Sequence, residues 1–369
     1  MTAISDPSPA VTDFRRALVD ALDTVGDATG RELWCALGRG GVLAAHTAGE
    51  DPRADRLRAL LTELDARYPL GVVLSVCVQV ATALPILLHG PASEHVAGVG
   101  AAALRGEAML ALAATDSAAS GSDLMDLGTT AVLGEDTVVL DGGKRWITNA
   151  GTADHLLVLA RHRPQRHFTS FLWVLVPADA PGLTVEPADG SMFAGSGVGH
   201  LSFDAVTLGR DHLVGAPGRG LATFSRHIAT ERLAGGLWAG AMCRRVLTDT
   251  RRALADKPLH GATAWDNDAV RQRFARCLVE SRRIDALCAD VCGGSGGLVD
   301  SMVLKASVAD SLDRVLGECV QLIGADAFGA GGVARLRAEA AMFGVAGGAT
   351  GAMLAGVADH ADDLLGGPR

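Results

Sequence analysis

The sequence predicts an α+β fold in which a β-rich segment separates two helical segments. Apolar residues recur at helical spacing up to about residue 110, short β-type runs follow, and helical spacing returns after about residue 215. Because strands and helices are grouped along the chain, we expect an α+β arrangement and not an alternating parallel sheet. We predict three domains, a helical one at 1–110, a β domain at 111–215 and a helical bundle at 216–369.

The first segment contains two amphipathic helices and one apolar helix. Asp13–Asp23 and Arg56–Leu64 place apolar side chains on one face. Gly71–Leu88 is almost continuously apolar, but polar residues interrupt it. We therefore expect a buried core helix there and no membrane span.

The middle segment contains short β-type runs with turn residues between them. These runs are Ala131–Leu133, Thr137–Leu140, Leu156–Leu159 and Phe171–Val176. We expect turns at Asp141–Gly143 and at Pro181–Gly182, which separate consecutive runs.

The last segment contains four long helical patterns. The predicted helices are Ala222–Ala255, Asp266–Cys292, Ser301–Ile323 and Ala334–Leu365. The run Gly293–Gly297 is a natural break between the second and the third helix.

Composition excludes several classes of protein. The 369 residues include 33 Lys+Arg and 42 Asp+Glu, so the formal charge is −9 and a nucleic-acid partner is not expected. The seven cysteines are odd in number, which fits reduced thiols in a cytoplasmic protein, and the N-terminus lacks the basic region of a signal peptide. Cys288 and Cys292 are four residues apart, but no second pair of ligands stands nearby, so we expect no metal site.

Ala114–Asp123 is a small, polar segment between the first helices and the β-type runs. Its hydroxyls and backbone N–H groups suit an anion such as a pyrophosphate. It matches neither a Walker loop nor a Gly-x-Gly-x-x-Gly fingerprint. The alternative is an ordinary solvated loop.

Asp141–Asn149 is a turn that leads into a strand. Trp146 and Thr148 would share one face of a strand because side chains alternate. An indole beside a hydroxyl could line a flat heteroaromatic ligand. The alternative is a half-buried strand with a core tryptophan.

Glu231 and Arg232 open an apolar helical run, Leu233–Met242. A carboxylate at the rim of an apolar site can act as a base near neutral pH. The alternative is an ion pair between Glu231 and a cation. The residues alone leave both interpretations open.

Together these segments resemble the acyl-CoA dehydrogenase superfamily over nearly the whole chain. The resemblance rests on the loop 115–123, on Gly142–Asn149 with Ala153-Asp154, on Leu201–Val206, on Gly215–Gly220, on Glu231-Arg232, and on Lys305 with Val320–Gly324. Trp146, Thr148 and Asn149 make up the most specific of these motifs.

The resemblance implies an N-terminal helical domain, a middle β-barrel-like domain and a C-terminal four-helix bundle. It also implies bound FAD, a homodimer or homotetramer, and a possible electron-transfer partner. The cofactor residues that it implies are Thr115, Ser122, Trp146 and Thr148 within one subunit, and Arg252 and Gln321 toward the FAD of the partner subunit.

The chemistry implied by the resemblance is α,β-dehydrogenation of an acyl thioester, either acyl-CoA or an acyl-carrier protein. Members of the family place the base at one of two positions. Gly347 stands at one of these positions, and Glu231 stands at the other. Glu231 is therefore the implied base, and the backbone N–H near Gly347 is the implied donor to the thioester oxygen.

The sequence departs from the family pattern mainly in its C-terminal half. Ala255-Asp256 replaces Phe-Gly, alanines replace two glycines after Gln321, and Asp116-Ser117 replaces Glu-Pro in the flavin loop. Two further functions therefore stay open, a flavin-dependent monooxygenase on the same fold and a non-catalytic partner subunit. Glu231 favours the dehydrogenase, because the monooxygenases generally lack that base.

Overall fold

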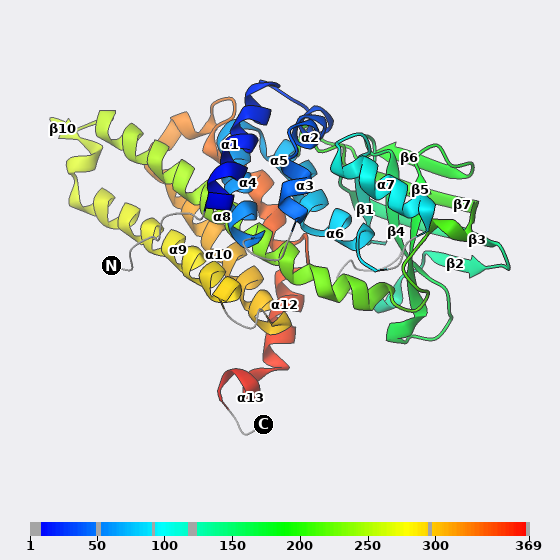
Figure 1. The fold of residues 1–369 in the computed structure, drawn as a ribbon. Helices are drawn as coiled ribbons and strands as arrows, with labels where there is room; N and C mark the ends of the chain where they lie inside the picture. The colour runs from blue at the N-terminus through cyan, green and yellow to red at the C-terminus, as the bar shows by residue number, and fades with distance from the viewer. Residues whose placement is uncertain (1–8, 49–52, 91–92, 117–123, 294–296, 367–369) are drawn as a thin grey trace. The chain divides into compact units, whose positions relative to one another are not determined.

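The computed structural model describes residues 9–48, 53–90, 93–116, 124–293 and 297–366 (Figure 1). The chain forms two compact units. Unit 1 contains residues 1–60 and 71–230, and unit 2 contains residues 61–70 and 231–369. The two units are described separately below. The three-domain division at residues 110 and 215 stays a prediction.

The first helices of unit 1 are α1 (Pro9–Asp23), α2 (Gly30–Arg39), α3 (Val42–Thr47) and the start of α4 (Arg53–Arg67). A capping box begins α2 at Thr29 and Glu32: the Thr29 hydroxyl oxygen accepts a hydrogen bond from the Glu32 N–H, and the Glu32 carboxylate accepts one from the Thr29 N–H. Further along lie α5 (Leu70–Val78), a π-helical turn at Gln79–Ala83, α6 (Leu84–Leu87) and α7 (Glu94–Leu104).

The apolar segment Leu70–Leu87 is a core helix, as the sequence predicts. Of the described residues, it alone is long and apolar enough to cross a membrane, and 89% of that window is buried. The π turn at Gln79–Ala83 was not predicted. Gln79 is buried within it, and its side chain accepts a hydrogen bond from the Leu110 N–H at 2.9 Å. Such turns are frequent at functional sites.

Unit 1 also contains a mixed sheet of eight strands. The strands are β1 (Leu110–Ala113), β2 (Thr130–Leu133), β3 (Thr137–Ile147), β4 (His155–Arg161), β5 (Phe171–Pro177), β6 (Leu183–Pro187), β7 (Gly199–Gly209) and β8 (Leu213–Val214). Their order is β6-β7-β3-β2-β4-β5-β8, and β1 pairs in parallel with β4. Apolar side chains from most of these strands form one buried cluster.

The turn predicted at Asp141–Gly143 is wrong. The strand β3 continues through these residues, and its register against β7 shifts between Leu140 and Gly142. Gly142 has a φ of +125°, which a glycine adopts without strain. A bulge therefore replaces the expected turn. The turn at Pro181–Gly182 is confirmed, since it separates β5 from β6.

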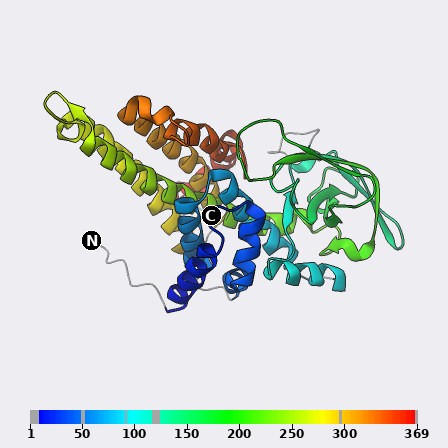
Figure 2. The same cartoon turned by 90° about the horizontal axis from the view of Figure 1, so that it is seen from above.

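Unit 2 is a helical bundle (Figure 2). Its helices are the part of α8 (Gly220–Asp256) from Glu231 onward, α9 (Asp268–Gly293), α10 (Leu298–Ile323), α11 (Val333–Ala340), α12 (Thr350–Ala358) and α13 (Ala361–Leu364). A short hairpin of β9 (Pro258–Leu259) and β10 (Ala262–Thr263) joins α8 to α9. The helix α10 packs against α9, α11 and α12. The predicted break between α9 and α10 is confirmed.

The prediction of one continuous helix over Ala334–Leu365 is wrong. The helix α11 ends at Ala340, a 3-10 turn follows at Ala341–Gly344, and α12 begins only at Thr350. Gly347 and Gly348 in this connection have φ values of +69° and +110°. A continuous right-handed helix cannot pass through these left-handed backbone conformations.

Candidate active site

Trp146 lies in a distortion of β3. The register of β3 against β7 shifts between Lys144 and Ile147, and Trp146 itself has a φ of +56°. The Trp146 N–H donates to Nδ1 of His200 on β7 at 3.2 Å, and the two rings are T-shaped with centroids 5.2 Å apart. Backbone strain of this kind gathers at functional sites.

The indole of Trp146 is an exposed ring on the wall of a pocket in unit 1. It is 59% exposed, whereas most large aromatic side chains of the chain are buried. The pocket measures about 340 Å³, and its remaining lining comes from the segment Ala188–Val198. A flat ring system fits such a site, because an indole face offers apolar area with defined stacking geometry.

Thr148 lies just beyond the end of β3. The prediction of a shared strand face for Trp146 and Thr148 assumed regular alternation, but β3 ends at Ile147 and is distorted before it. Thr148 is half-buried in the turn that follows. The alternation of side chains along a regular strand therefore does not apply to Trp146 and Thr148, and it cannot be used to place them on one face.

Lys144 joins the two motifs that the sequence analysis assigned to the flavin. Its Nζ lies 3.2 Å from Oδ2 of Asp116, and both side chains are almost completely buried. The same Asp116 oxygen accepts hydrogen bonds from the hydroxyl and the backbone N–H of Thr129, at 2.8 and 3.0 Å. Burial lowers the pKa of Lys144 to about 8, and the negative charge of Asp116 opposes this shift.

Thr115 is held at the start of the same loop. It is half-buried, and its carbonyl accepts a hydrogen bond from the Arg145 N–H at 3.2 Å. This bond places Thr115 beside the strand that carries Trp146. Ser122 lies outside the described residues, as does most of the loop 114–123.

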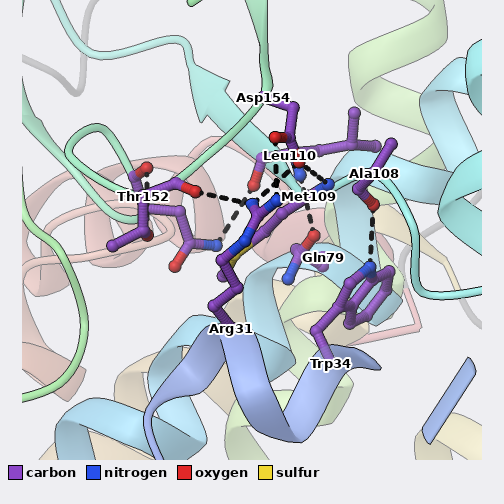
Figure 3. A network of polar contacts seen from close by, with 9 residues as sticks. Arg31, Trp34, Gln79, Ala108, Met109, Leu110, Thr152 and Asp154 are labelled. Atoms are coloured by element: carbon purple, nitrogen blue, oxygen red, sulfur yellow. Dashed lines mark hydrogen bonds and ion pairs between the residues drawn. The ribbon is translucent and has the colours of Figure 1, made fainter. Parts of the chain in front are cut away.

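Asp154 anchors the chain where it enters β1 (Figure 3). Its carboxylate accepts two hydrogen bonds from the Arg31 guanidinium, at 2.8 and 2.9 Å, and one from the Met109 N–H at 2.8 Å. Asn149, fully buried, donates to the carbonyls of Ser75 and Leu110. Both residues therefore hold backbone in place, and their part in the motif is structural.

In unit 2, Glu231 lies against Gly347. A methyl group placed on the Cα of Gly347 would lie 3.1 Å from Oε1 of Glu231. Glu231 is half-buried on α8, and Gly347 precedes α12. The two positions that the resemblance implies for the base are thus neighbours, and of these two residues only Glu231 carries a carboxylate.

Arg232 supports the Gly347 segment from the same helix. It is buried, its Nη1 donates to Oγ of Ser301 at 3.0 Å, and its Nε donates to the Gly347 carbonyl at 3.5 Å. These two hydrogen bonds, to Ser301 and to Gly347, account for the burial of Arg232. An ion pair with Glu231 is therefore not needed to explain why Arg232 is buried. Burial lowers the pKa of Arg232, and the charge of Glu231 opposes this shift.

Arg252 and Gln321 are exposed on α8 and α10 of unit 2. Arg252 forms a surface ion pair with Asp249 at 3.1 Å. Their role toward the cofactor of a partner subunit stays a prediction.

Sequence reasoning did not identify every residue near these two sites. His200 was missed because no local pattern relates it to Trp146, which lies 54 residues earlier. Lys305 was noticed only as part of a motif, although it lies beside Gly347. The described residues contain no group of His, Cys, Asp or Glu that could hold a metal ion, and the seven cysteines, all of which are described, form no disulfide.

Two family models match the chain. The middle domain of acyl-CoA dehydrogenase matches residues 111–206, and its C-terminal domain matches residues 218–361. The chain belongs to the acyl-CoA dehydrogenase superfamily. The α+β fold and the family predicted from the sequence are therefore confirmed.

Two relatives of this superfamily cover most of the chain. The acyl-[acyl-carrier-protein] dehydrogenase MbtN of Mycobacterium sp. (strain MCS) is 29% identical over 81% of this chain and 77% of its own length. The cyclohex-1-ene-1-carbonyl-CoA dehydrogenase of Geobacter metallireducens is 27% identical over 81% of this chain and 80% of its own length.

Solved structures of the superfamily share the fold. An FAD complex of PigA has a TM-score of 0.88 at 18% identity and covers 96% of this chain and 98% of its own. The prolyl acyl carrier protein oxidase AnaB has a TM-score of 0.84 at 19% identity and covers 96% of this chain and 99% of its own.

Proposed function

We propose that this acyl-CoA dehydrogenase-like protein is an FAD-dependent enzyme that introduces an α,β double bond into an acyl thioester. The observation that carries the proposal is the half-buried Glu231 carboxylate beside Gly347, at the start of the apolar stretch Leu233–Met242 of α8. The family membership and the dehydrogenase names of the relatives support the reaction class.

The residues of unit 1 fit the flavin. Trp146 offers an exposed ring at a pocket, Thr148 follows it, and the Asp116–Lys144 pair fixes the start of the loop that begins at Thr115. We assign Trp146, Thr148, Thr115 and Ser122 to the FAD of the same subunit, and Arg252 and Gln321 to that of a partner subunit in a homo-oligomer. When bound, FAD supplies the acceptor for the β-hydrogen.

Glu231 is the proposed base in unit 2. Its carboxylate removes the α-proton of the acyl group and holds it. The backbone N–H near Gly347 is the proposed donor to the thioester oxygen, and its hydrogen bond makes the α-proton more acidic because it stabilises the developing enolate. Arg232 contributes by holding the Gly347 carbonyl.

The acyl group can be carried by CoA or by a protein. Among the relatives, MbtN is named for an acyl-carrier protein, and the Geobacter enzyme is named for a CoA ester. We propose the carrier-protein thioester as the first candidate, because MbtN matches with the higher identity and AnaB, a carrier-protein oxidase, shares the fold. An electron-transfer partner that reoxidises the flavin and a cytoplasmic location stay predictions.

The experiment is anaerobic flavin bleaching. We expect the FAD-loaded protein to bleach with a saturated acyl thioester, offered on CoA and on a phosphopantetheinyl carrier protein in parallel. The Glu231→Gln variant should bind FAD normally but bleach slower by several orders of magnitude, about 10³-fold or more, since general base catalysis is lost. A flavin that responds only to a reductase would indicate a monooxygenase, and a protein that stays free of FAD would indicate a non-catalytic subunit.

A further inference from the structure

Lys305 is a buried lysine that borders the proposed base. It lies on α10 and is 7% exposed. A methyl group on the Cα of Gly347 would lie 3.7 Å from Cε of Lys305 and 3.1 Å from Oε1 of Glu231. The two side chains therefore approach the same point of the backbone from two different helices, α10 and α8 of unit 2.

Lys305 also ties α10 to the segment that carries Gly347. Its Nζ donates a hydrogen bond to the carbonyl of Phe343, four residues before Gly347. Phe343 is itself fixed, since its ring packs edge-on against Trp238 with centroids 5.1 Å apart. Two side chains therefore hold the backbone between α11 and α12. Lys305 bonds to the carbonyl of Phe343, and Arg232 bonds to the carbonyl of Gly347.

The charges around Lys305 are few in the part of the chain that the structure describes. The pKa of Lys305 is lowered to about 8, mainly by burial; the charge of Glu231 opposes this shift, and the charge of Arg232 adds to it. Glu231 and Arg232 both lie on α8, whereas the contact of Lys305 with Phe343 is to an uncharged backbone carbonyl. Glu231 is therefore the acidic group that favours the ammonium form of Lys305.

The choice of lysine here is specific. The chain has three lysines, Lys144, Lys257 and Lys305, against 30 arginines. An ammonium group is compact, and it can be buried beside one carbonyl and one carboxylate without the five donors of a guanidinium. The Glu231 carboxylate already lies close to Gly347, so a compact ammonium group fits beside it more easily than a guanidinium does.

We propose that Lys305 is a positioning residue of the dehydrogenase, which fixes the Gly347 segment and keeps the Glu231 carboxylate in its proton-accepting form. This inference rests on the proposed function, in which Glu231 is the base. Electrostatic coupling is reciprocal: a carboxylate that favours the charged lysine is itself favoured in its charged form by that lysine. Without Lys305, the carboxylate would take up a proton at a higher pH and would be a base over a narrower range.

The first test measures the coupling without any substrate. With only three lysines, the FAD-loaded protein labelled with [¹³C]lysine gives three Cε signals, which Lys→Arg variants assign. We expect the Lys305 signal to titrate near pH 8 in the wild type. In Glu231→Gln it should titrate about one pH unit or more lower, because the favourable charge is gone. The Lys257 signal serves as the internal control and should not move. An unchanged Lys305 midpoint in Glu231→Gln would overturn the proposal.

The second test measures the consequence for catalysis. We expect Lys305→Met to shift the acid limb of anaerobic flavin reduction by octanoyl-CoA about one pH unit upward, and Lys305→Arg, which retains the charge in a larger group, to shift it less than Lys305→Met. The matched control is Lys257→Met, which removes a lysine bonded to the carbonyls of Leu322 and Ile323. No shift in Lys305→Met, or an equal shift in the control, would contradict a role through Glu231.

The two tests separate this inference from the proposed function. If Glu231→Gln bleaches at the wild-type rate, then Glu231 is not the base and the proposed function fails, while the lysine titration still reports whether the two groups are coupled. If Glu231→Gln is inactive but the titration of Lys305 does not respond to it, only the inference about Lys305 fails.

Discussion

Nζ of Lys144 lies 3.2 Å from Oδ2 of Asp116 in the interior of unit 1, where neither side chain is more than 1% exposed. The pair links the strand of Trp146 to the loop that begins at Thr115, and an isolated β-bridge joins the same two residues through the backbone. A buried ion pair is costly to form but more costly to break on one side. Its position here indicates that it fixes Asp116, at the point where the loop begins.

The Lys144–Asp116 pair predicts an asymmetric mutational response. Asp116→Ala should destabilise the protein by about 3–5 kcal/mol, because it leaves a buried ammonium without its carboxylate. The double variant Asp116→Leu/Lys144→Met should be less destabilised than Asp116→Ala, since it removes both charges together. Thermal unfolding followed by circular dichroism measures this, and a double variant less stable than Asp116→Ala would contradict it.

The residues of this pair could be identified from the sequence, but their relationship could not. Asp116 appeared as a departure from the family pattern, where a glutamate is usual, and Lys144 appeared as a motif position. The structure shows that the Asp116 carboxylate accepts hydrogen bonds from Lys144 and Thr129. The contact joins residues 28 positions apart, a separation that no local pattern specifies.

Trp146 predicts a fluorescence response to FAD. Trp34, Trp173 and Trp238 are at most 1% exposed, whereas Trp146 is 59% exposed. Acrylamide should therefore quench mainly Trp146, and FAD binding should protect it. We expect Trp146→Phe to remove most of the FAD-dependent protection. Trp265→Phe is the control, because its half-buried ring lies under the Arg251 guanidinium in unit 2. Equal protection in Trp146→Phe would argue against a flavin at this ring.

The geometry of Trp146 marks a limit of sequence reasoning. The helical and β-type textures correctly located the long helices and most of the central strands, because apolar periodicity reflects burial. The bulge at Trp146 and the continuation of β3 through Gly142 depend on pairing with β7, which lies about 60 residues later. Gly142 suggested a turn by its type, but pairing with β7 decided that it would form a bulge.

His46 predicts a loss of stability in acid. It is buried on α3, and burial lowers its pKa to about 4, with the charges of Arg53 and Arg56 acting in the same direction. The unfolded state therefore binds more protons than the folded state between pH 6.5 and 4, so stability should fall as the pH falls through this range.

Replacing His46 should reduce that dependence. In His46→Leu, the decrease of the unfolding temperature between pH 6.5 and 4 should be smaller than in the wild type. Some decrease should remain, because burial also lowers the pKa of His227 to about 4. His167→Leu changes an exposed ring and is the matched control. If the unfolding temperature of His46→Leu decreases between pH 6.5 and 4 as much as that of the wild type, His46 does not cause the loss of stability in acid.

The connection around Gly347 was the least predictable part of the C-terminal segment. Its residues are small and apolar, which is typical of a helix, and so Ala334–Leu365 was predicted as one helix. A continuous right-handed helix cannot pass through the left-handed backbone at Gly347 and Gly348, and the bonds from Arg232 and Lys305 to nearby carbonyls hold the connection that takes its place. The partners of those carbonyls come from distant helices, and a single-sequence pattern does not identify them.

Gly347→Ala tests this connection and the proposed base together. The added methyl group would lie 3.1 Å from Oε1 of Glu231, and alanine at a φ of +69° costs about 1 kcal/mol. We expect a modest loss of thermal stability and a much larger loss in the rate of flavin reduction, because the carboxylate must move. Gly351→Ala is the matched control: it lies in the first turn of α12 with open space around it, and alanine favours a helix there. Equal reduction rates in the two variants would show that the position of the Glu231 carboxylate does not limit the reaction, and that its closeness to Gly347 is only a packing contact.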